Sequence, residues 1–309
     1  MDSRPLTHRT FPASSLAAAC LLLAWLALPA CAAAQSTQAA AQSTQYTDLI
    51  RAAMQNQVED NAHLHLFSWK ERKDDGRKTK VERQLQTPSG IVSRVVLIND
   101  QPLNPAQQTA EDERTQSMVD PEQMRHALKE QRDDNARTRK MLLAIPDAFD
   151  FTYLSTSDGA DGHKLVSLSF TPRPGYDPPS RETMVFTGMR GEIQIDETAS
   201  RIVTIDGTLF KDVTFGWGIF GRLYKGGRFV VEQAEIAPSH WDTTHMLLHF
   251  DGRELIFKSI HIYDDETSWD FQPVPPMSAE EALDYLNRPE TAQNAAAQNA
   301  TAQNARLRR

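Results

Sequence analysis

A glycine-rich segment in the second half of the chain has the spacing of a nucleotide-binding loop. Residues 216–221 read Gly-Trp-Gly-Ile-Phe-Gly and match the pattern Gly-x-Gly-x-x-Gly. Nucleotide binding needs a helix directly after such a loop, because the helix N–H groups bind the pyrophosphate. Here a second glycine turn, at 225–227, and a strand-like segment follow instead. We predict a loop or bulge between strands that exposes Trp217 and Phe220, and no nucleotide site.

Two pairs of histidines are spaced so that each pair shares one face of a regular strand. They are His63 with His65, and His245 with His249. Imidazoles are good metal ligands, but a metal site needs three or four ligands. No cysteine follows Cys31 to supply the others. We therefore interpret these residues as solvated strand histidines, and we predict no metal and no cofactor.

The sequence contains no clear motif for catalysis or calcium binding. The acidic clusters at 111–113 and 264–266 lack the glycine and the regular spacing of a calcium loop, so we interpret them as solvated charge. Neither a Gly-x-Ser-x-Gly elbow nor the protein-kinase catalytic motifs occur. We predict a protein that is not an enzyme. An exported hydrolase or metal-dependent enzyme remains an alternative, and it would require a cluster of His, Asp and Glu side chains in the fold.

The composition excludes several classes of protein. The chain has 309 residues, a formal net charge of −8 and 2 cysteines. Both cysteines lie within the first 31 residues, so no disulfide framework or thiol chemistry is available downstream. The acidic balance argues against nucleic-acid binding, which requires a basic face.

The N-terminus has the three parts of an export signal. Arg4 and Arg9 precede an apolar run at 11–30, which ends in small residues. We predict a signal peptide at 1–34, cleaved after Ala34, and a protein exported to the periplasm. Two alternatives remain. The run could be an uncleaved anchor, or the Leu-Pro-Ala-Cys sequence that ends at Cys31 could act as a lipobox, so that Cys31 is lipidated and holds the protein on an envelope membrane.

Low-complexity segments flank the rest of the chain. Residues 35–45 and 289–309 repeat Ala, Gln, Ser, Thr and Asn without large apolar side chains, so we predict a disordered linker and a disordered tail. The arginines at the C-terminal tip allow contact with a membrane surface. The remaining residues, 46–288, fit one domain by length.

Hydrophobic periodicity and turn signals predict the elements of this domain. We expect a helix at 47–61 and a helical insertion at about 105–145, in which a helix begins at Asp120-Pro121 and stops before Pro146. A short helix begins at Ser278. Asp-Gly turns are expected at 158–159, 206–207 and 251–252. The predicted strands are 63–69, 79–86, 91–98, 165–170, 184–187, 192–196, 201–205, 209–215, 228–236, 245–250 and 255–263.

Short turns between these strands require antiparallel pairing. Roughly ten such strands should curl to hide their edges and one apolar face. We therefore predict an α+β fold that is mainly antiparallel β, with a strongly curved, half-barrel-like sheet, an N-terminal helix and a helical insertion. A curved sheet of this size can enclose an apolar cavity.

The layout resembles the periplasmic lipoprotein-carrier superfamily, which includes the outer-membrane lipoprotein-sorting proteins. An exported helix leads into a strand that ends in the aromatics Phe67 and Trp69. A hairpin with an Ile-Asp strand end and an Arg-Ile restart follows at 191–196 and 201–205, and segment 229–236 resembles the later strands. The resemblance implies a non-enzymatic fold that shields acyl chains. The insertion at 104–145 and the proline-rich loop at 172–179 depart from the compact carriers.

The resulting hypothesis is a monomeric envelope protein that binds or carries an apolar ligand, either a lipid or the acyl chains of a lipoprotein. The alternative is a structural or interaction protein of the envelope with a filled core and no ligand. For the first hypothesis, the aromatic residues expected to line the cavity are Phe67, Trp69, Phe186, Trp217, Phe220, Phe229, Trp241 and Phe257.

Overall fold

The computed structural model describes residues 44–159, 162–215, 221–254 and 258–288. The chain divides into two compact units, Met1–Gln45 and Tyr46–Arg309, and the second unit is the subject below. The predicted signal peptide, including Cys31, and the predicted tail at 289–309 lie outside the described residues.

A single antiparallel sheet of 13 strands forms the second unit, as the predicted fold class requires. Its main path runs β4-β3-β2-β1-β13-β12-β11-β8-β7-β6-β5, and the short β9–β10 pair branches from β12. The strands are β1 (Phe67–Asp74), β2 (Thr79–Thr87), β3 (Gly90–Ile98), β4 (Gln101–Pro102), β5 (Phe149–Asp158), β6 (Lys164–Pro172), β7 (Met189–Asp196), β8 (Arg201–Leu209), β9 (Val213–Phe215), β10 (Gly221–Leu223), β11 (Arg228–Ala237), β12 (His240–Glu254) and β13 (Lys258–Pro273).

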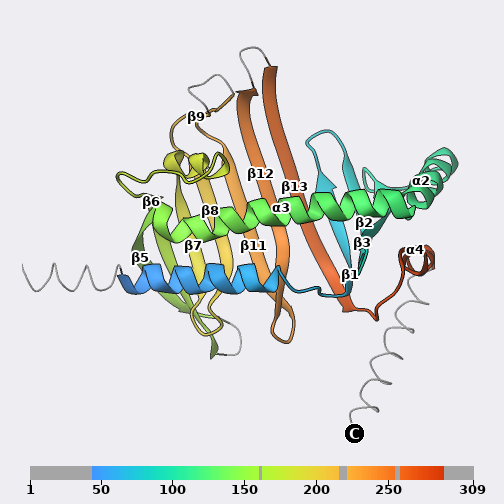
Figure 1. The fold of residues 1–309 in the computed structure, drawn as a ribbon, viewed down its shortest axis with the longest axis horizontal. Coiled ribbons are helices and arrows are strands. Elements are labelled where there is room, and N and C mark those ends of the chain that lie inside the picture. The colour runs from blue at the N-terminus through green and yellow to red at the C-terminus, as the bar shows by residue number, and fades with distance from the viewer. Residues whose placement is uncertain (1–43, 160–161, 216–220, 255–257, 289–309) are drawn as a thin grey trace, which may run out of the picture. The chain divides into compact units, whose positions relative to one another are not determined.

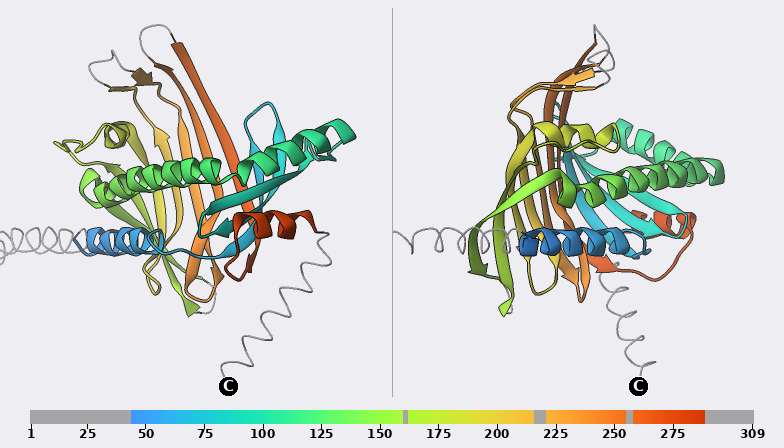
Figure 2. Two further views of the ribbon diagram at one scale, coloured as in Figure 1. Left: turned by 45° about the vertical axis from the view of Figure 1, so that its right-hand side comes forward. Right: turned by 60° about the vertical axis from the view of Figure 1, so that its left-hand side comes forward.

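Two helices cross the same face of this curved sheet (Figures 1 and 2). One comprises residues 44–60 and the other is α3 (Pro121–Ala148). We call the face that they cover the inner face and the opposite one the outer face. The other helices are α2 (Pro105–Met118), the 3₁₀ helix η2 (Glu182–Gly188) and α4 (Ala279–Asn287).

Strand β12 illustrates how alternation divides side chains between the faces. Phe250 is buried in the main apolar cluster and Leu248 packs against it, so the even-numbered residues of this stretch face inward. The odd-numbered His245, His249 and Asp251 therefore lie on the outer face.

Two apolar clusters hold the inner layer. The larger joins Ile50 and Met54 of the first helix and Ala148 of α3 to the sheet core around Leu168 and Ile195. The smaller lies at the other end of α3, where Met124 packs with residues of β2, β3 and α4, among them Leu85, Val92, Leu283 and Leu286. Helix α3 is thus anchored at both ends and spans the space between.

Local capping fixes the helix starts. Asp120 caps α3 by accepting hydrogen bonds from the backbone N–H groups of Glu122 (2.9 Å) and Gln123 (3.3 Å), as predicted. Ser278 and Glu281 form the predicted capping box of α4. The sequence analysis did not separate α2, which begins with its own capping box between Asn104 and Gln107.

The predicted end of α3 before Pro146 is wrong, because the helix continues to Ala148. A proline removes only one helical hydrogen bond, and here it does so in the last turn. Arg173 supplies hydrogen-bond donors to backbone carbonyls at this end of the helix. Its backbone N–H donates to the carbonyl of Ala148 (2.8 Å), and its guanidinium donates to the carbonyls of Pro146 (3.2 Å) and Phe149 (3.0 Å).

Three predicted strands also differ from the structure, and the one at 209–215 is interrupted at 210–212 between β8 and β9. Residues 63–66 are not in a strand, because His63 continues the helix-end turn through a backbone bond to Asp60 (3.0 Å), and β1 begins at Phe67. Residues 184–187 lie in the 3₁₀ helix η2. Its first turn is held by Thr183 Oγ1, which donates to the carbonyl of Ser180 (2.9 Å) and accepts from the N–H of Ser180 (3.1 Å).

Of the three predicted Asp-Gly turns, the one at 158–159 lies at the connection between β5 and β6, and the other two are not turns. Residues 206–207 lie within β8, and residues 251–252 lie within β12. Instead, neighbouring parts of the chain approach these glycines closely. A Cβ on Gly207 would lie 3.0 Å from the Met189 sulfur, and a Cβ on Gly252 would lie 2.5 Å from the Arg222 carbonyl oxygen of β10. Glycine is thus needed at 252, where the β10 backbone comes too close for a side chain, whereas at 207 a side chain would require Met189 to shift.

Candidate functional site

A cleft of about 750 Å³ lies between the inner face of the sheet, helix α3 and the end of the first helix with the loop that follows it. This volume is in the range of small-molecule binding sites. Most of its lining is apolar. The apolar side chains are Ala62, Leu64, Pro88, Leu128, Met141, Leu142, Ile145, Phe186, Ile202, Ile205, Phe229, Val231, Trp241 and Met246.

Helix α3 forms one wall of the cleft. Its lining residues recur every three or four positions and so occupy one helical face. The end of this wall nearest the main core is apolar, with Met141, Leu142 and Ile145. Its middle is polar, with Gln131, Arg132 and Asn135. Because both ends of α3 are anchored in apolar clusters, its middle can carry polar side chains over the cleft.

The end of the first helix closes one side of the cleft with charged groups. Asp60 Oδ2 lies 2.9 Å from Arg201 Nη1, and Asp60 Oδ1 lies 3.3 Å from His65 Nε2. The Arg201 guanidinium also donates to the carbonyl of Asn56 (3.2 Å), and the Asn56 amide donates to the carbonyl of Ser200 (3.0 Å). These contacts fix the helix end to the start of β8.

A second carboxylate, Asp242 of β12, lines the same part of the cleft. Its side chain is accessible to solvent, but the cleft walls around it reduce its hydration. This desolvation raises the pKa of Asp242. The N–H of Thr243 donates to Asp242 Oδ1 (2.7 Å) and, with the nearby His65, opposes the rise, whereas Asp60 adds to it.

Two buried glutamines add polar groups without partners. Gln57 and Gln233 both line the cleft and are 7% and 9% exposed. The Oε1 atom of each has no hydrogen-bond partner among the described residues. Buried polar atoms are nearly always satisfied in folded proteins, so these two buried Oε1 atoms leave this part of the lining short of hydrogen-bond donors.

The structure separates the aromatic residues that the sequence analysis grouped. Phe186, Phe229 and Trp241 line the cleft. Phe67 is buried beside the His240 ring, with centroids 5.9 Å apart, and Trp69 stacks on Phe271 at 6.3 Å. Neither lines the cleft. Trp217, Phe220 and Phe257 lie outside the described residues.

The sequence did not predict that α3 forms a wall of the cleft or that polar residues gather at one end of it. The spacing of Met141, Leu142 and Ile145 is a helical signal that could have indicated the α3 wall. Nothing in the sequence indicates that Gln57 and Gln233, which are far apart along the chain, meet in one cleft. The acidic cluster at 111–113 is also not simply solvated, because Glu111 is 6% exposed and accepts the N–H of Val95 (2.7 Å).

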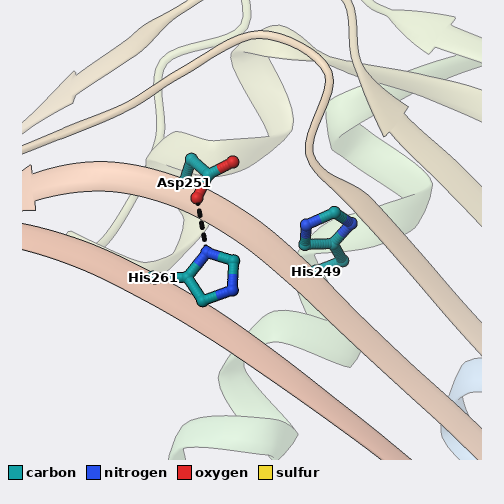
Figure 3. A group of neighbouring side chains, drawn as sticks. All are labelled: His249, Asp251 and His261. Atoms are coloured by element: carbon teal, nitrogen blue, oxygen red, sulfur yellow. Dashed lines mark hydrogen bonds and ion pairs between the residues drawn. The ribbon is translucent and has the colours of Figure 1, made fainter. Parts of the chain in front are cut away.

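Among the described residues, neither histidine pair lies together in a group of three potential metal ligands. His63 and His65 lie in the loop before β1, where the His65 ring contacts the His240 ring at 4.4 Å. His245 Nε2 lies 3.0 Å from Asp265 Oδ1. Within the described residues, one group of three potential ligands occurs, and it combines His249 with Asp251 and His261 on the outer face (Figure 3).

None of the helices that the structure describes has the length and apolar character needed to cross a bilayer.

Comparisons with known proteins do not assign a family. No protein-family profile and no curated protein matches the chain. A crystal structure of a DUF1329 family protein from Desulfovibrio piger is similar at 12% sequence identity, over 76% of this chain and 95% of that chain, with a TM-score of 0.26. A TM-score this low supports no argument about function, and the resemblance to lipoprotein carriers stays a prediction.

Proposed function

We propose that this protein is an exported bacterial envelope protein that holds an amphiphile, with an acyl chain, in the cleft under α3. The observation that carries the proposal is the cleft itself. It has a continuous apolar floor on the inner face and unpartnered polar atoms at one end.

The apolar floor supplies the binding free energy. Phe229 and Val231 of β11, Ile202 and Ile205 of β8, and Met246 of β12 line it side by side on neighbouring strands. Transfer of each methylene from water to such a surface is worth about 0.8 kcal/mol. An acyl chain with several methylenes in contact would therefore bind without any charged anchor.

The polar end supplies orientation. The buried Oε1 atoms of Gln57 and Gln233 lack hydrogen-bond donors, and a hydroxyl or amide near the head of an amphiphile would supply donors when these side chains turn toward the cleft. The carboxylates of Asp60 and Asp242 lie in the same part of the cleft. Such an end disfavours a further negative charge, so a neutral or cationic head group is preferred at this position, and a fatty acid should place its carboxylate away from these two residues.

The proposed location rests on the leader sequence at 1–34. Fractionation of the producing cell, with mass analysis of the mature N-terminus, tests it. Release with the periplasm and a first residue at Gln35 support export with cleavage. An acylated Cys31 would instead indicate a carrier that is anchored to a membrane.

The binding proposal is tested with cis-parinaric acid, a fluorescent fatty acid, on the full chain as processed by the cell. Thr138 and Ala136 are both exposed on α3, but only Thr138 lines the cleft. Thr138→Trp fills the cleft without removing a buried side chain, and Ala136→Trp adds the same ring outside it. We expect Thr138→Trp to weaken binding by at least about tenfold, which is ~1.4 kcal/mol.

Ala136→Trp should bind like the unmodified protein, and palmitate should displace the probe from both. Val231→Trp fills the cleft from the sheet side. It provides the same test if the ring in Thr138→Trp turns outward. Absence of probe binding by the unmodified protein, or equal binding by all variants, would contradict the proposal and favour the structural alternative without a ligand.

A further inference from the structure

Three side chains on the outer face of the β12–β13 hairpin lie close enough to share one ligand. Asp251 and His261 are directly opposite each other in the register of the two strands, and His249 precedes Asp251 by two residues on the same face. One potential ligand atom from each residue lies within 4.8 Å of the others. Figure 3 shows the His261 ring turned toward Asp251, with the His249 ring beside them.

The geometry is that of a partly closed metal site. Ligand atoms at about 2.1 Å from a tetrahedral metal are about 3.4 Å apart, so the largest separation has to close by only about 1.4 Å. His249 is half-buried, whereas Asp251 and His261 are exposed, so small side-chain rotations can achieve this. Strands β12 and β13 are paired on both sides of the group, which fixes the backbone positions of all three residues.

The ligand types select the class of metal. Two imidazoles with one carboxylate suit zinc and other divalent first-row transition metals better than calcium or magnesium, which prefer oxygen ligands alone. His261 Nδ1 lies 2.6 Å from Asp251 Oδ1. This contact holds the His261 ring in place and lets Asp251 act either as a ligand or as the carboxylate that orients the imidazole.

We propose that His249, Asp251 and His261 form a binding site for a divalent transition metal such as Zn²⁺, with its fourth position open to water. The site lies on the face opposite the cleft and does not depend on the proposed function. Arg253 follows two residues later on the same face, and its positive charge should keep the affinity moderate.

The same face carries a matched control. His245 also lies beside carboxylates, with Asp265 at 3.0 Å and Glu232 at 3.8 Å, but within the described part of the chain it belongs to no group of three potential ligands. The test is isothermal titration of ZnCl₂ into the full chain, without an affinity tag and after treatment with EDTA. The variants are His249→Ala, His261→Ala and Asp251→Asn, with His245→Ala as the control.

We expect one equivalent of Zn²⁺ to bind. Each of the three site variants should lose more than about tenfold in affinity, and His245→Ala should stay within about twofold. Binding should weaken between about pH 8 and about pH 5, because a protonated imidazole cannot bind metal. Co²⁺ should give the visible absorption of a four-coordinate site in the unmodified protein and in His245→Ala only.

All of these substitutions replace surface side chains of one hairpin, and circular dichroism checks that each variant is folded. No heat of zinc binding, or an equal loss in His245→Ala and His249→Ala, would overturn the proposal. Probe binding in the cleft is measured separately, so failure of the metal site and failure of the cleft proposal can be told apart.

Discussion

The inner and outer faces of the sheet take alternate residues of the same strands but suit different ligands. On β12, Met246 faces the cleft and Phe250 the main core, whereas His249 and Asp251 face outward. The inner face is shaped by packing against helices, so its binding depends on volume and apolar area. The outer face has no helix over it in the described structure, and its binding depends on a few polar atoms in register (Figure 2). One strand can thus serve two functions, which can be tested separately.

The largest difference between the faces should appear in stability. Ile193 of β7 is 2% exposed in the main core, and its neighbour Glu192 is exposed on the other face. Ile193→Ala should lower the free energy of unfolding by about 2 to 5 kcal/mol, because it leaves a cavity. Glu192→Ala should change it by less than about 0.5 kcal/mol. Urea denaturation measures both, and similar midpoints would show that the inner face is not the packed one.

Two ion pairs of the same chemistry sharpen the comparison. Arg201 and Asp60, beside the cleft, are 15% and 13% exposed, whereas Arg228 and Asp206, on the outer face, are 51% and 40% exposed. Arg201→Met leaves a poorly solvated carboxylate and should cost about 1 to 3 kcal/mol. Arg228→Met should cost about 0.5 kcal/mol or less. Equal shifts in the midpoint of urea denaturation would mean that the helix end is not fixed by Arg201.

Two aromatic residues from the predicted site test which surface binds the ligand. Phe229 lines the cleft and Trp69 does not. Phe229→Ala should weaken the binding of cis-parinaric acid by about fivefold, or ~1 kcal/mol, through lost apolar contact. Trp69→Ala should leave it within about twofold, provided that thermal melts show both variants folded. A larger effect from Trp69→Ala would move the ligand away from the cleft.

The smallest effect concerns Asp242. Desolvation raises its pKa in the folded protein, so its contribution to stability is present below the unfolded pKa of about 3.9 and is lost as the pH rises through the folded value. Asp242→Asn keeps a neutral acceptor for the N–H of Thr243. We expect it to stabilise the protein at neutral pH by a few tenths of a kcal/mol, because water in the cleft screens the charge.

This gain should disappear below about pH 3, where the native aspartate is also protonated. The measurement is the free energy of unfolding of both proteins across this pH range. Loss of stability in Asp242→Asn at neutral pH would mean that the charged form of Asp242 is stabilised by a partner.

Local signals predicted much of this fold. Alternation and polar turns indicated antiparallel strands, and the caps at Asp120 and Ser278 were predicted correctly because each depends on residues two or three positions apart. The strand at 184–187 was wrong because a local turn between Ser180 and Thr183 begins a 3₁₀ helix there. The end of α3 was wrong because Arg173, distant in sequence, holds the last helical turn.

The group of His249, Asp251 and His261 on the outer face shows why the sequence could not predict which residues of β12 and β13 lie opposite each other. An Asp-Gly sequence usually marks a turn, and a turn at 251–252 would remove Asp251 from the strand. The glycine is present because β10 passes close to Gly252. Once β12 continues to Glu254, Asp251 lies opposite His261, and His249 gains two possible co-ligands. The cleft residues Gln57 and Gln233 meet for a similar reason, through folding of segments distant in sequence.

The central claim is that the cleft under α3 holds an apolar ligand in the cell. Native mass spectrometry of the mature protein, gently purified from the envelope of the producing cell, tests it most directly. We predict a reproducible excess mass that extracts into organic solvent as lipid and is reduced in Thr138→Trp but not in Ala136→Trp. Bare protein that gains no mass with added phospholipid or acylated peptide would contradict the claim.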